Sequence, residues 1–178
     1  MIETERLILR NWREADVEPF IRHLNTEAVM RYLGGVKSPA FLREVVLDRF
    51  MHWQEHYGHT FWVVERKEDG ALLGFCGLKV ADDATSPVEG EIEIGWRLRE
   101  DVWGQGYAKE AAIASLDYAF RELRAPRVVA LTVPANDASW GLMERLGMTR
   151  RPDLDYEGPE WAVGPVIVYV IGSMEWPT

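Results

Sequence analysis

The sequence has very little cysteine and no long run of apolar residues. Cys76 is the single cysteine among 178 residues, so no internal disulfide can form. No apolar stretch is long enough to cross a bilayer, and the first residues, Met1 to Arg6, contain no apolar signal core. We therefore expect a protein of the reducing cytoplasm rather than one that is secreted or held in a membrane.

Positive charge is also scarce. Lysine and arginine together number 20, against 29 aspartate and glutamate residues, which gives a net charge of -9. This balance argues against a broad electrostatic grip on nucleic acid or anionic lipid, and we expect neither as a partner. It would suit a cationic ligand, although charge alone does not select one.

What is present is the material of one folded domain, which we expect to span residues 1–178. The hydrophobic fraction is 47%, enough to bury a substantial core, and no repeat divides the chain. Alternation of polar and apolar residues, β-branched density and flanking turn residues predict strands at 6–10, 61–65, 72–78, 91–98, 127–133, 148–150 and 166–171. Helical spacing and capping residues predict helices at 14–24, 39–57, 107–123 and 137–146. This alternation predicts a mixed α/β architecture with a largely central sheet.

Two closely spaced glycines, Gly104 and Gly106, stand between a predicted strand and a predicted helix. Such a turn leaves unpaired backbone N–H groups near the positive end of the helix dipole, an arrangement that binds anions and above all phosphates. A simple tight turn is the competing interpretation. A dinucleotide-binding motif fits less well, because Lys109 stands where a third glycine is due. A nucleotide P-loop fits worse still, because the chain contains no Gly-Lys pair.

Five segments, in order along nearly the whole chain, resemble motifs of one family, the GNAT superfamily of N-acetyltransferases, and more narrowly its RimJ and RimL branch. They resemble the opening strand, the hairpin strand, the fourth strand, the pyrophosphate loop and the segment that completes the cofactor site: Thr4 to Arg10, Gly74 to Leu78, Glu93 to Leu98, Trp103 to Ala111, and Asn136 to Ser139 followed by Leu146-Gly147-Met148. Cys76 stands where this branch usually has isoleucine. Trp103 stands where the superfamily usually has glutamine or arginine, a departure that leaves binding by backbone N–H groups intact.

The resemblance implies an α/β fold whose mixed central sheet is flanked by helices and splayed at the cofactor cleft. It implies acetyl-CoA as the cofactor and direct acetyl transfer to a primary amine, either a protein N-terminus or a small amine. Backbone N–H near Arg97 and Leu98 would stabilise the oxyanion, Arg99 and Lys109 could neutralise phosphates, and Asn136 would bond the pantetheine arm. The full set of implied cofactor-binding residues is Arg97, Leu98, Arg99, Gly104, Gln105, Gly106, Tyr107, Ala108, Lys109, Asn136 and Ser139.

Amine acetylation requires a base, because an ammonium cannot attack a thioester and amine pKa values are about 8 for an N-terminus and about 10.4 for lysine. Glu93 ranks first as this base. Glu91 shares its strand face, and Glu160 lies in a late acidic loop. Ser139 is the expected acid beside the departing thiolate, and an ordinary residue of a helical first turn is the alternative.

Three further expectations complete the hypothesis. His52, His56 and His59 match no known ligand pattern, so we expect surface histidines and no metal. The alternative function is a catalytically inactive member that binds acyl-CoA as a sensor or scaffold. Acceptor choice is expected to lie in Tyr32 to Pro39 and Asp153 to Pro165, and a homodimer is compatible with the branch.

Overall fold

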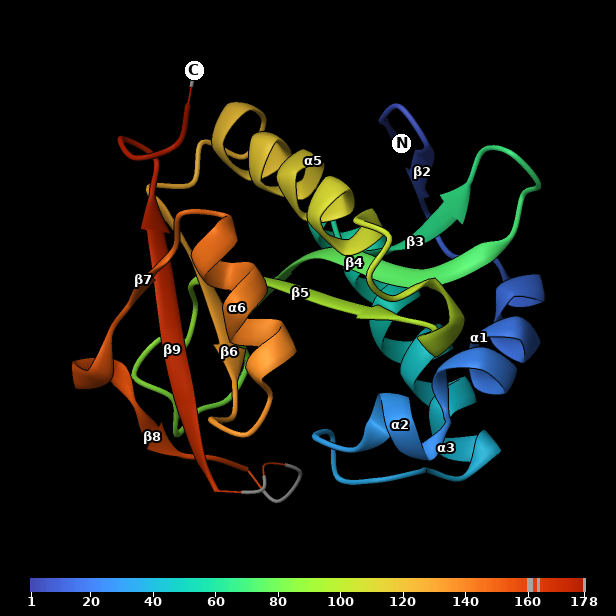
Figure 1. Ribbon diagram of the computed structural model, residues 1–178, viewed down its shortest axis with the longest axis horizontal. Coiled ribbons are helices and arrows are strands. Elements are labelled where there is room, and N and C mark those ends of the chain that lie inside the picture. The colour runs from blue at the N-terminus through green and yellow to red at the C-terminus, as the bar shows by residue number, and fades with distance from the viewer. Residues whose placement is uncertain (160–161, 163, 178) are drawn as a thin grey trace.

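One mixed sheet runs through the molecule, whose computed structural model describes residues 1–159, 162 and 164–177. The strands lie in the order β1-β2-β3-β4-β5-β6-β9-β7, with β8 paired to β9 (Figure 1). Within the described residues all neighbouring strands are antiparallel except β5 and β6, which are parallel. The strands are β1 (Ile2–Glu3), β2 (Leu7–Arg10), β3 (Phe61–Arg66), β4 (Leu72–Val80), β5 (Ile92–Leu98), β6 (Arg127–Thr132), β7 (Thr149–Arg150), β8 (Tyr156–Glu157) and β9 (Pro165–Gly172).

The helices begin and end where the sequence supplies caps. Ser38 accepts a hydrogen bond from the Phe41 N–H at 3.2 Å and so starts the long helical segment, which ends at Gly58 with φ of 71°. That segment consists of α3, a π-helical stretch (Val45–Phe50) and α4. None of the described helices is long and apolar enough to span a bilayer. The α-helices are α1 (Val17–Leu24), α2 (Glu27–Met30), α3 (Pro39–Glu44), α4 (Met51–Tyr57), α5 (Tyr107–Arg121) and α6 (Asp137–Arg145).

The two faces of the sheet are covered by different elements. Helices α5 and α6 cover one face, where Leu116 and Met143 share a buried cluster with Ile94 and Leu98 of β5 (Figure 1). On the other face, α1, α3 and the π-helical stretch pack on β3 and β4. A third, smaller cluster includes buried valines of β6 and β9 and the buried Val88 of the loop that precedes β5.

Alternation along β5 places Glu93, Gly95 and Arg97 on the face opposite α5, because Ile94 and Leu98 enter the α5 cluster. Strand β5 lies between β4 and β6, so these three residues, hereafter the β5 stripe, lie between the cluster under α1 and the cluster on β6 and β9. Gly95 lies under the Phe61 ring and Arg97 lies against the Phe75 ring, so Glu93 and Arg97 are the two polar side chains of the stripe.

Strands β5 and β6 separate soon after they meet. They pair at two positions, Ile92 with Val128 and Glu93 with Val129, whereas β4 and β5 pair at seven. Beyond Glu93 the two strands run in different directions (Figure 1). This divergence confirms the predicted α/β fold with a mixed central sheet, flanked by helices and splayed between the two parallel strands.

The predicted elements are all present, with boundaries that shift by a few residues. The predicted helix at 14–24 divides into a 3₁₀ turn (Glu14–Asp16) and α1. The strands β1 and β8 were not predicted, because two-residue strands carry no period that a sequence pattern can reveal.

Candidate active site

The loop between β5 and α5 holds a row of backbone N–H groups without acceptors. From Gly104 to Lys109 none of these groups donates to an acceptor in the described part of the chain, and the first helical bond joins the Glu110 N–H to the Gly106 carbonyl at 3.0 Å. Gly104 and Gly106 have φ of 73° and 83°, a region that glycine adopts without the penalty of a Cβ. These donors surround the positive end of the α5 dipole and therefore fit a pyrophosphate.

The N-terminal segment fastens this loop. The Arg6 guanidinium donates to the Gln105 carbonyl at 3.0 Å and to the Glu110 carboxylate at 2.7 Å, and the Thr4 hydroxyl donates to the same carboxylate at 2.6 Å. Burial favours a raised pKa for Glu110, but the bonds from Thr4 and Arg6 outweigh it and lower that pKa below its ordinary value. The ionised Glu110 carboxylate thus links the N-terminal residues Thr4 and Arg6 to the first turn of α5.

The sequence analysis did not predict these contacts of Thr4 and Arg6 with Glu110. Thr4 and Arg6 were placed in the opening strand motif and Glu110 in the loop motif, but neither motif assigned these side chains a role. A signal existed, because an arginine and a glutamate occupy fixed places in two motifs of the same site. Only the fold shows that Arg6 and Glu110, which are more than 100 residues apart in the sequence, are in direct contact.

The two cations predicted to neutralise phosphates, Arg99 and Lys109, differ in whether they already have a carboxylate partner. Arg99 donates from Nε to the Asp101 carboxylate at 2.6 Å, so its charge is already balanced. Lys109 is exposed and has no carboxylate partner within the described residues. The ring of Tyr107 is buried beneath the Arg6 guanidinium, so Tyr107 contributes its N–H to the loop and its side chain to the core. Ala108 is partly buried and likewise offers its N–H.

The open edge of β5 supplies a further donor. Arg99 N–H bonds the Leu73 carbonyl at 2.8 Å, and alternation in an antiparallel ladder then directs the Arg97 N–H at β4 and the Leu98 N–H toward the gap between β5 and β6. Of the two backbone donors expected from the sequence, the ladder therefore engages Arg97 and leaves Leu98. The exposed Trp103 indole donates to the Leu98 carbonyl at 2.8 Å and fixes this end of β5.

Asn136 and Ser139 lie across the gap, at the start of α6. Because β5 and β6 are parallel, their carboxyl ends lie at one edge of the sheet, and α5 and α6 both begin beyond that edge. Asn136 caps α6 by accepting the Ser139 N–H at 3.4 Å. The Ser139 side chain is partly exposed, and its hydroxyl has no partner within the described residues. Its hydroxyl is therefore able to donate to a ligand.

Glu93 marks the point where β5 and β6 diverge. Its carboxylate lies 3.3 Å from Lys79 Nζ, and its side chain is 13% exposed. Burial raises the pKa of Glu93 above its ordinary value, although Lys79 opposes the shift. Lys79 is itself engaged, since it pairs with Asp82 and lies 5.7 Å from the centre of the Trp53 ring. A carboxylate with a raised pKa is a better proton acceptor than a solvated one.

The other candidates of the sequence stand elsewhere. The carboxylate of Glu91 accepts the Arg127 Nε–H at 2.9 Å, which occupies it in an ion pair. Glu160 lies outside the described residues. His52 and His56 are exposed, but the prediction of a surface histidine was wrong for His59, which is buried with Nδ1 3.1 Å from the Leu78 carbonyl. Among the described residues, no group of three potential ligand side chains could hold a metal ion.

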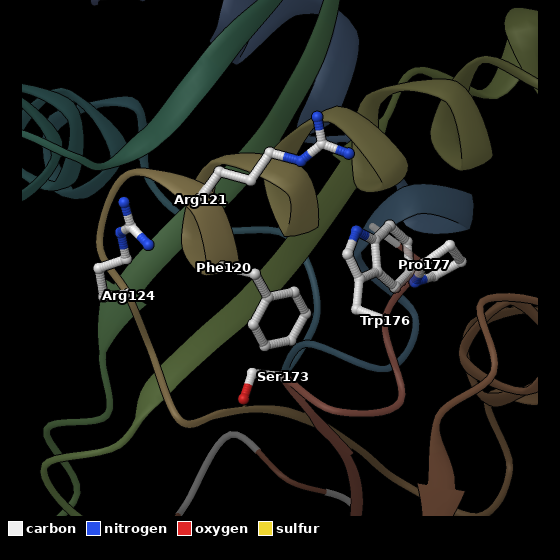
Figure 2. A pocket seen from close by; sticks show the side chains of 6 residues that line it. All are labelled: Phe120, Arg121, Arg124, Ser173, Trp176 and Pro177. Carbon is white, nitrogen blue, oxygen red and sulfur yellow. The ribbon is translucent and has the colours of Figure 1, made fainter.

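A separate hollow lies at the other end of α5, where helix and C-terminal residues meet (Figure 2). It has a volume of about 350 Å³ and is lined by Phe120, Arg121, Arg124, Ser173, Trp176 and Pro177. Thirteen residues of α5, which begins at Tyr107, lie between the glycine loop and Phe120, a rise of roughly 20 Å. This hollow is therefore no part of the site at the splayed strands.

Comparison with known proteins identifies the family. The family model "Acetyltransferase (GNAT) domain" matches residues 6–149. The chain is 35% identical over 150 residues to "Uncharacterized protein YkkB" of Bacillus subtilis, covering 82% of this chain and 83% of that protein. It is 28% identical to "Uncharacterized N-acetyltransferase YnaD" of the same species, with 98% of both chains covered.

The solved structures agree in fold. A GNAT-family acetyltransferase of Bacillus anthracis superposes with a TM-score of 0.78 at 26% identity, covering 98% of this chain and 99% of the other. An acetyltransferase of Agrobacterium tumefaciens gives a TM-score of 0.78 at 29% identity, with coverage of 96% and 92%. This chain therefore belongs to the GNAT acetyltransferase family and is an acetyl-CoA-dependent acetyltransferase.

Proposed function

We propose that this enzyme moves an acetyl group from acetyl-CoA directly to the primary amine of an acceptor. The observation that carries the proposal is the row of unpaired N–H groups from Gly104 to Lys109 beside a gap in the sheet whose opposite side bears Asn136 and Ser139. The donors fit the pyrophosphate, and the gap offers backbone and side-chain partners to an extended arm. Acetyl-CoA, when bound, supplies an acetyl group activated as a thioester.

The base in this proposal is Glu93. A primary amine arrives as an ammonium at neutral pH and must lose a proton before it can attack. Glu93 is buried and has a raised pKa, and it stands where the two strands part. The proton is accepted at its carboxylate, either directly or through a water molecule, and Lys79, 3.3 Å away, favours the ionised form of that carboxylate.

Two further groups can stabilise the negative charge that develops on the thioester oxygen and on the departing sulfur. The Leu98 N–H faces the gap and can donate to an oxygen that gains negative charge. The Ser139 hydroxyl, which has no partner within the described residues, can donate a proton to a departing thiolate and regain one from the second proton that the amine nitrogen loses. Both assignments rest on the availability of the donor and on its place at the edge of the gap.

The branch of the family and the cellular location are also proposals. We place the enzyme near the RimJ and RimL branch on its motifs. A structure described as ribosomal-protein-S5-alanine acetyltransferase from Vibrio fischeri, 16% identical with a TM-score of 0.73, supports the fold alone. A cytoplasmic location is supported by the single cysteine, which is free and buried.

Calorimetry and a thiol-release assay test the proposal. Acetyl-CoA should bind at about one equivalent, and a panel of peptides and small primary amines should include acceptors that release free CoA thiol. Binding without thiol release for any amine would instead favour an inactive acyl-CoA binder. Failure of acetyl-CoA to bind at all would refute the assignment of the glycine loop.

A further inference from the structure

The side chain of Arg97 is unlike that of any other arginine in the chain. All 16 arginines lie in the described part of the chain, and seven of them are not exposed. Six of those seven pair with a carboxylate within the described residues, namely Arg10, Arg66, Arg99, Arg127, Arg150 and Arg151. Arg97 pairs with no carboxylate, and its buried Nε–H has no hydrogen-bond partner, in the part of the chain that the structure describes.

Burial without a counterion is costly for this side chain. Desolvation lowers the pKa of Arg97 to about 10. The guanidinium lies against the Phe75 ring, 5.2 Å from its centre, which restricts the plane in which its N–H groups point. A guanidinium held in one plane with an unused Nε–H presents a fork that matches the two oxygens of a carboxylate.

The location of Arg97 separates it from the pyrophosphate loop. Arg97 projects from the β5 stripe, on the face opposite α5, and shares that face with Glu93. Gly95 lies between them, and the Phe61 ring occupies the space over Gly95, since a Cβ there would come within 2.8 Å of that ring. The cation and the proposed base therefore lie on the same face of β5 on either side of the Phe61 ring, with Cα atoms roughly 13 Å apart along an extended strand.

We propose that Arg97 receives a carboxylate of the acceptor, so that the substrate is a small primary amine that also carries a carboxyl group. This inference rests on the proposed amine acetylation and narrows its acceptor class. The negative net charge of the chain does not oppose it, because the group at this position is a buried cation with no partner among the described residues.

The test compares matched acceptors in the thiol-release assay at saturating acetyl-CoA. Each amino acid is paired with its own amide, which has the same side chain and a neutral end. The amide has the lower amine pKa and is therefore the better nucleophile at neutral pH, so a preference for the acid cannot come from amine reactivity. We expect kcat/KM for the best acid to exceed that of its amide by about 10–100-fold, the range of one charged hydrogen-bonded contact.

Arg97→Gln is the discriminating variant, and Arg124→Gln is its control, because Arg124 is exposed and pairs with no carboxylate of the described residues. In Arg97→Gln the acid-over-amide ratio should fall close to one through a higher KM for the acid, while the Kd for acetyl-CoA stays at the wild-type value. In Arg124→Gln the ratio should not change. Arg97→Met should melt at a higher temperature than the wild type without ligand, because an unpaired buried charge is replaced by an apolar side chain of similar length.

Three outcomes would overturn the inference while leaving amine acetylation intact: equal use of acids and amides by the wild type, an unchanged ratio in Arg97→Gln, or a preference for phosphoethanolamine over every carboxylate. A wild type that binds acetyl-CoA but acetylates no amine would instead refute the proposed function. In that case calorimetry of the amino acids against wild type and Arg97→Gln decides whether the carboxylate site exists, and equal heats in the two proteins would exclude it.

Discussion

The guanidinium of Arg6 donates to the backbone carbonyl of Gln105 at 3.0 Å, which joins the start of the chain to the centre of the glycine loop. The same side chain bonds Glu110 in the first turn of α5. A loop whose carbonyl is held in place also has its N–H groups held in place, because each peptide unit is planar. Arg6 therefore acts as a positioning residue for the anion site, although it lies outside the segment that binds.

Removal of this contact should loosen the loop. Arg6→Met keeps much of the side-chain length and should weaken acetyl-CoA binding by about tenfold, the effect of one charge-assisted hydrogen bond. Calorimetry measures the Kd, and the melting temperature shows whether the fold is retained. Arg43→Met is the control, because Arg43 pairs with Glu18 on the surface. An unchanged Kd in Arg6→Met would show that the loop keeps its shape unaided.

A side chain at Gly106 should abolish acetyl-CoA binding. With φ of 83°, Gly106→Val strains the backbone and displaces the N–H groups on either side. Gly70→Val is a matched control, since Gly70 has φ of 71° and open space around it in a hairpin turn. We expect both variants to lose stability and only Gly106→Val to lose binding. Normal binding by Gly106→Val would refute the loop as the anion site.

Loss of the Ser139 hydroxyl should affect turnover more than binding. Ser139→Ala should lower kcat by roughly 100-fold, the lower part of the range for general acid catalysis, with little change in the Kd for acetyl-CoA. Ser173→Ala, in the distant hollow of Figure 2, should behave as the wild type. If Ser139→Ala turns over at the wild-type rate with a good acceptor, Ser139 is an ordinary residue of the α6 first turn.

Glu93 should set the acidic limb of the pH profile. Burial raises the pKa of this carboxyl, and a base works only when ionised, so kcat/KM should fall as the pH drops through a value above the ordinary glutamate pKa of about 4.3. The groups that share its surroundings are Lys79, Asp82 and Tyr156. Glu93→Gln should lower kcat by about 100-fold and remove this limb. Persistence of the same limb in Glu93→Gln would transfer the role to another group.

Cys76 of the native enzyme should not react in a thiol assay. Its side chain is fully buried in the α5 cluster, and burial raises the pKa of the thiol to about 12. Native enzyme should therefore react negligibly with a disulfide reagent, and denatured enzyme should release one equivalent. Rapid reaction of the native protein would contradict the burial of Cys76 and would require Cys76→Ala as the assay background.

The sequence alone determined where the longer helices and strands form and in what order. Ser38 and Pro39 start one helix, Gly58 ends it, and Gly106 starts another, because these residues act through their own backbone geometry and need no distant partner. Alternation along β5 likewise placed Glu93 on one face of a strand before the fold was known. The loop motif and its family resemblance therefore predicted the anion site, with every donor in one short segment.

Only the tertiary structure decided which charges are already balanced. Arg97, Arg99 and Lys109 are equivalent cations in the sequence, yet the fold pairs Arg99 with Asp101, exposes Lys109, and buries Arg97 against Phe75 without a carboxylate within the described residues. Arg6 and Glu110 meet only because β2 and α5 pack together. Pairing and desolvation depend on residues far apart in the chain, so the chemistry of a charged side chain is fixed by the packing around it.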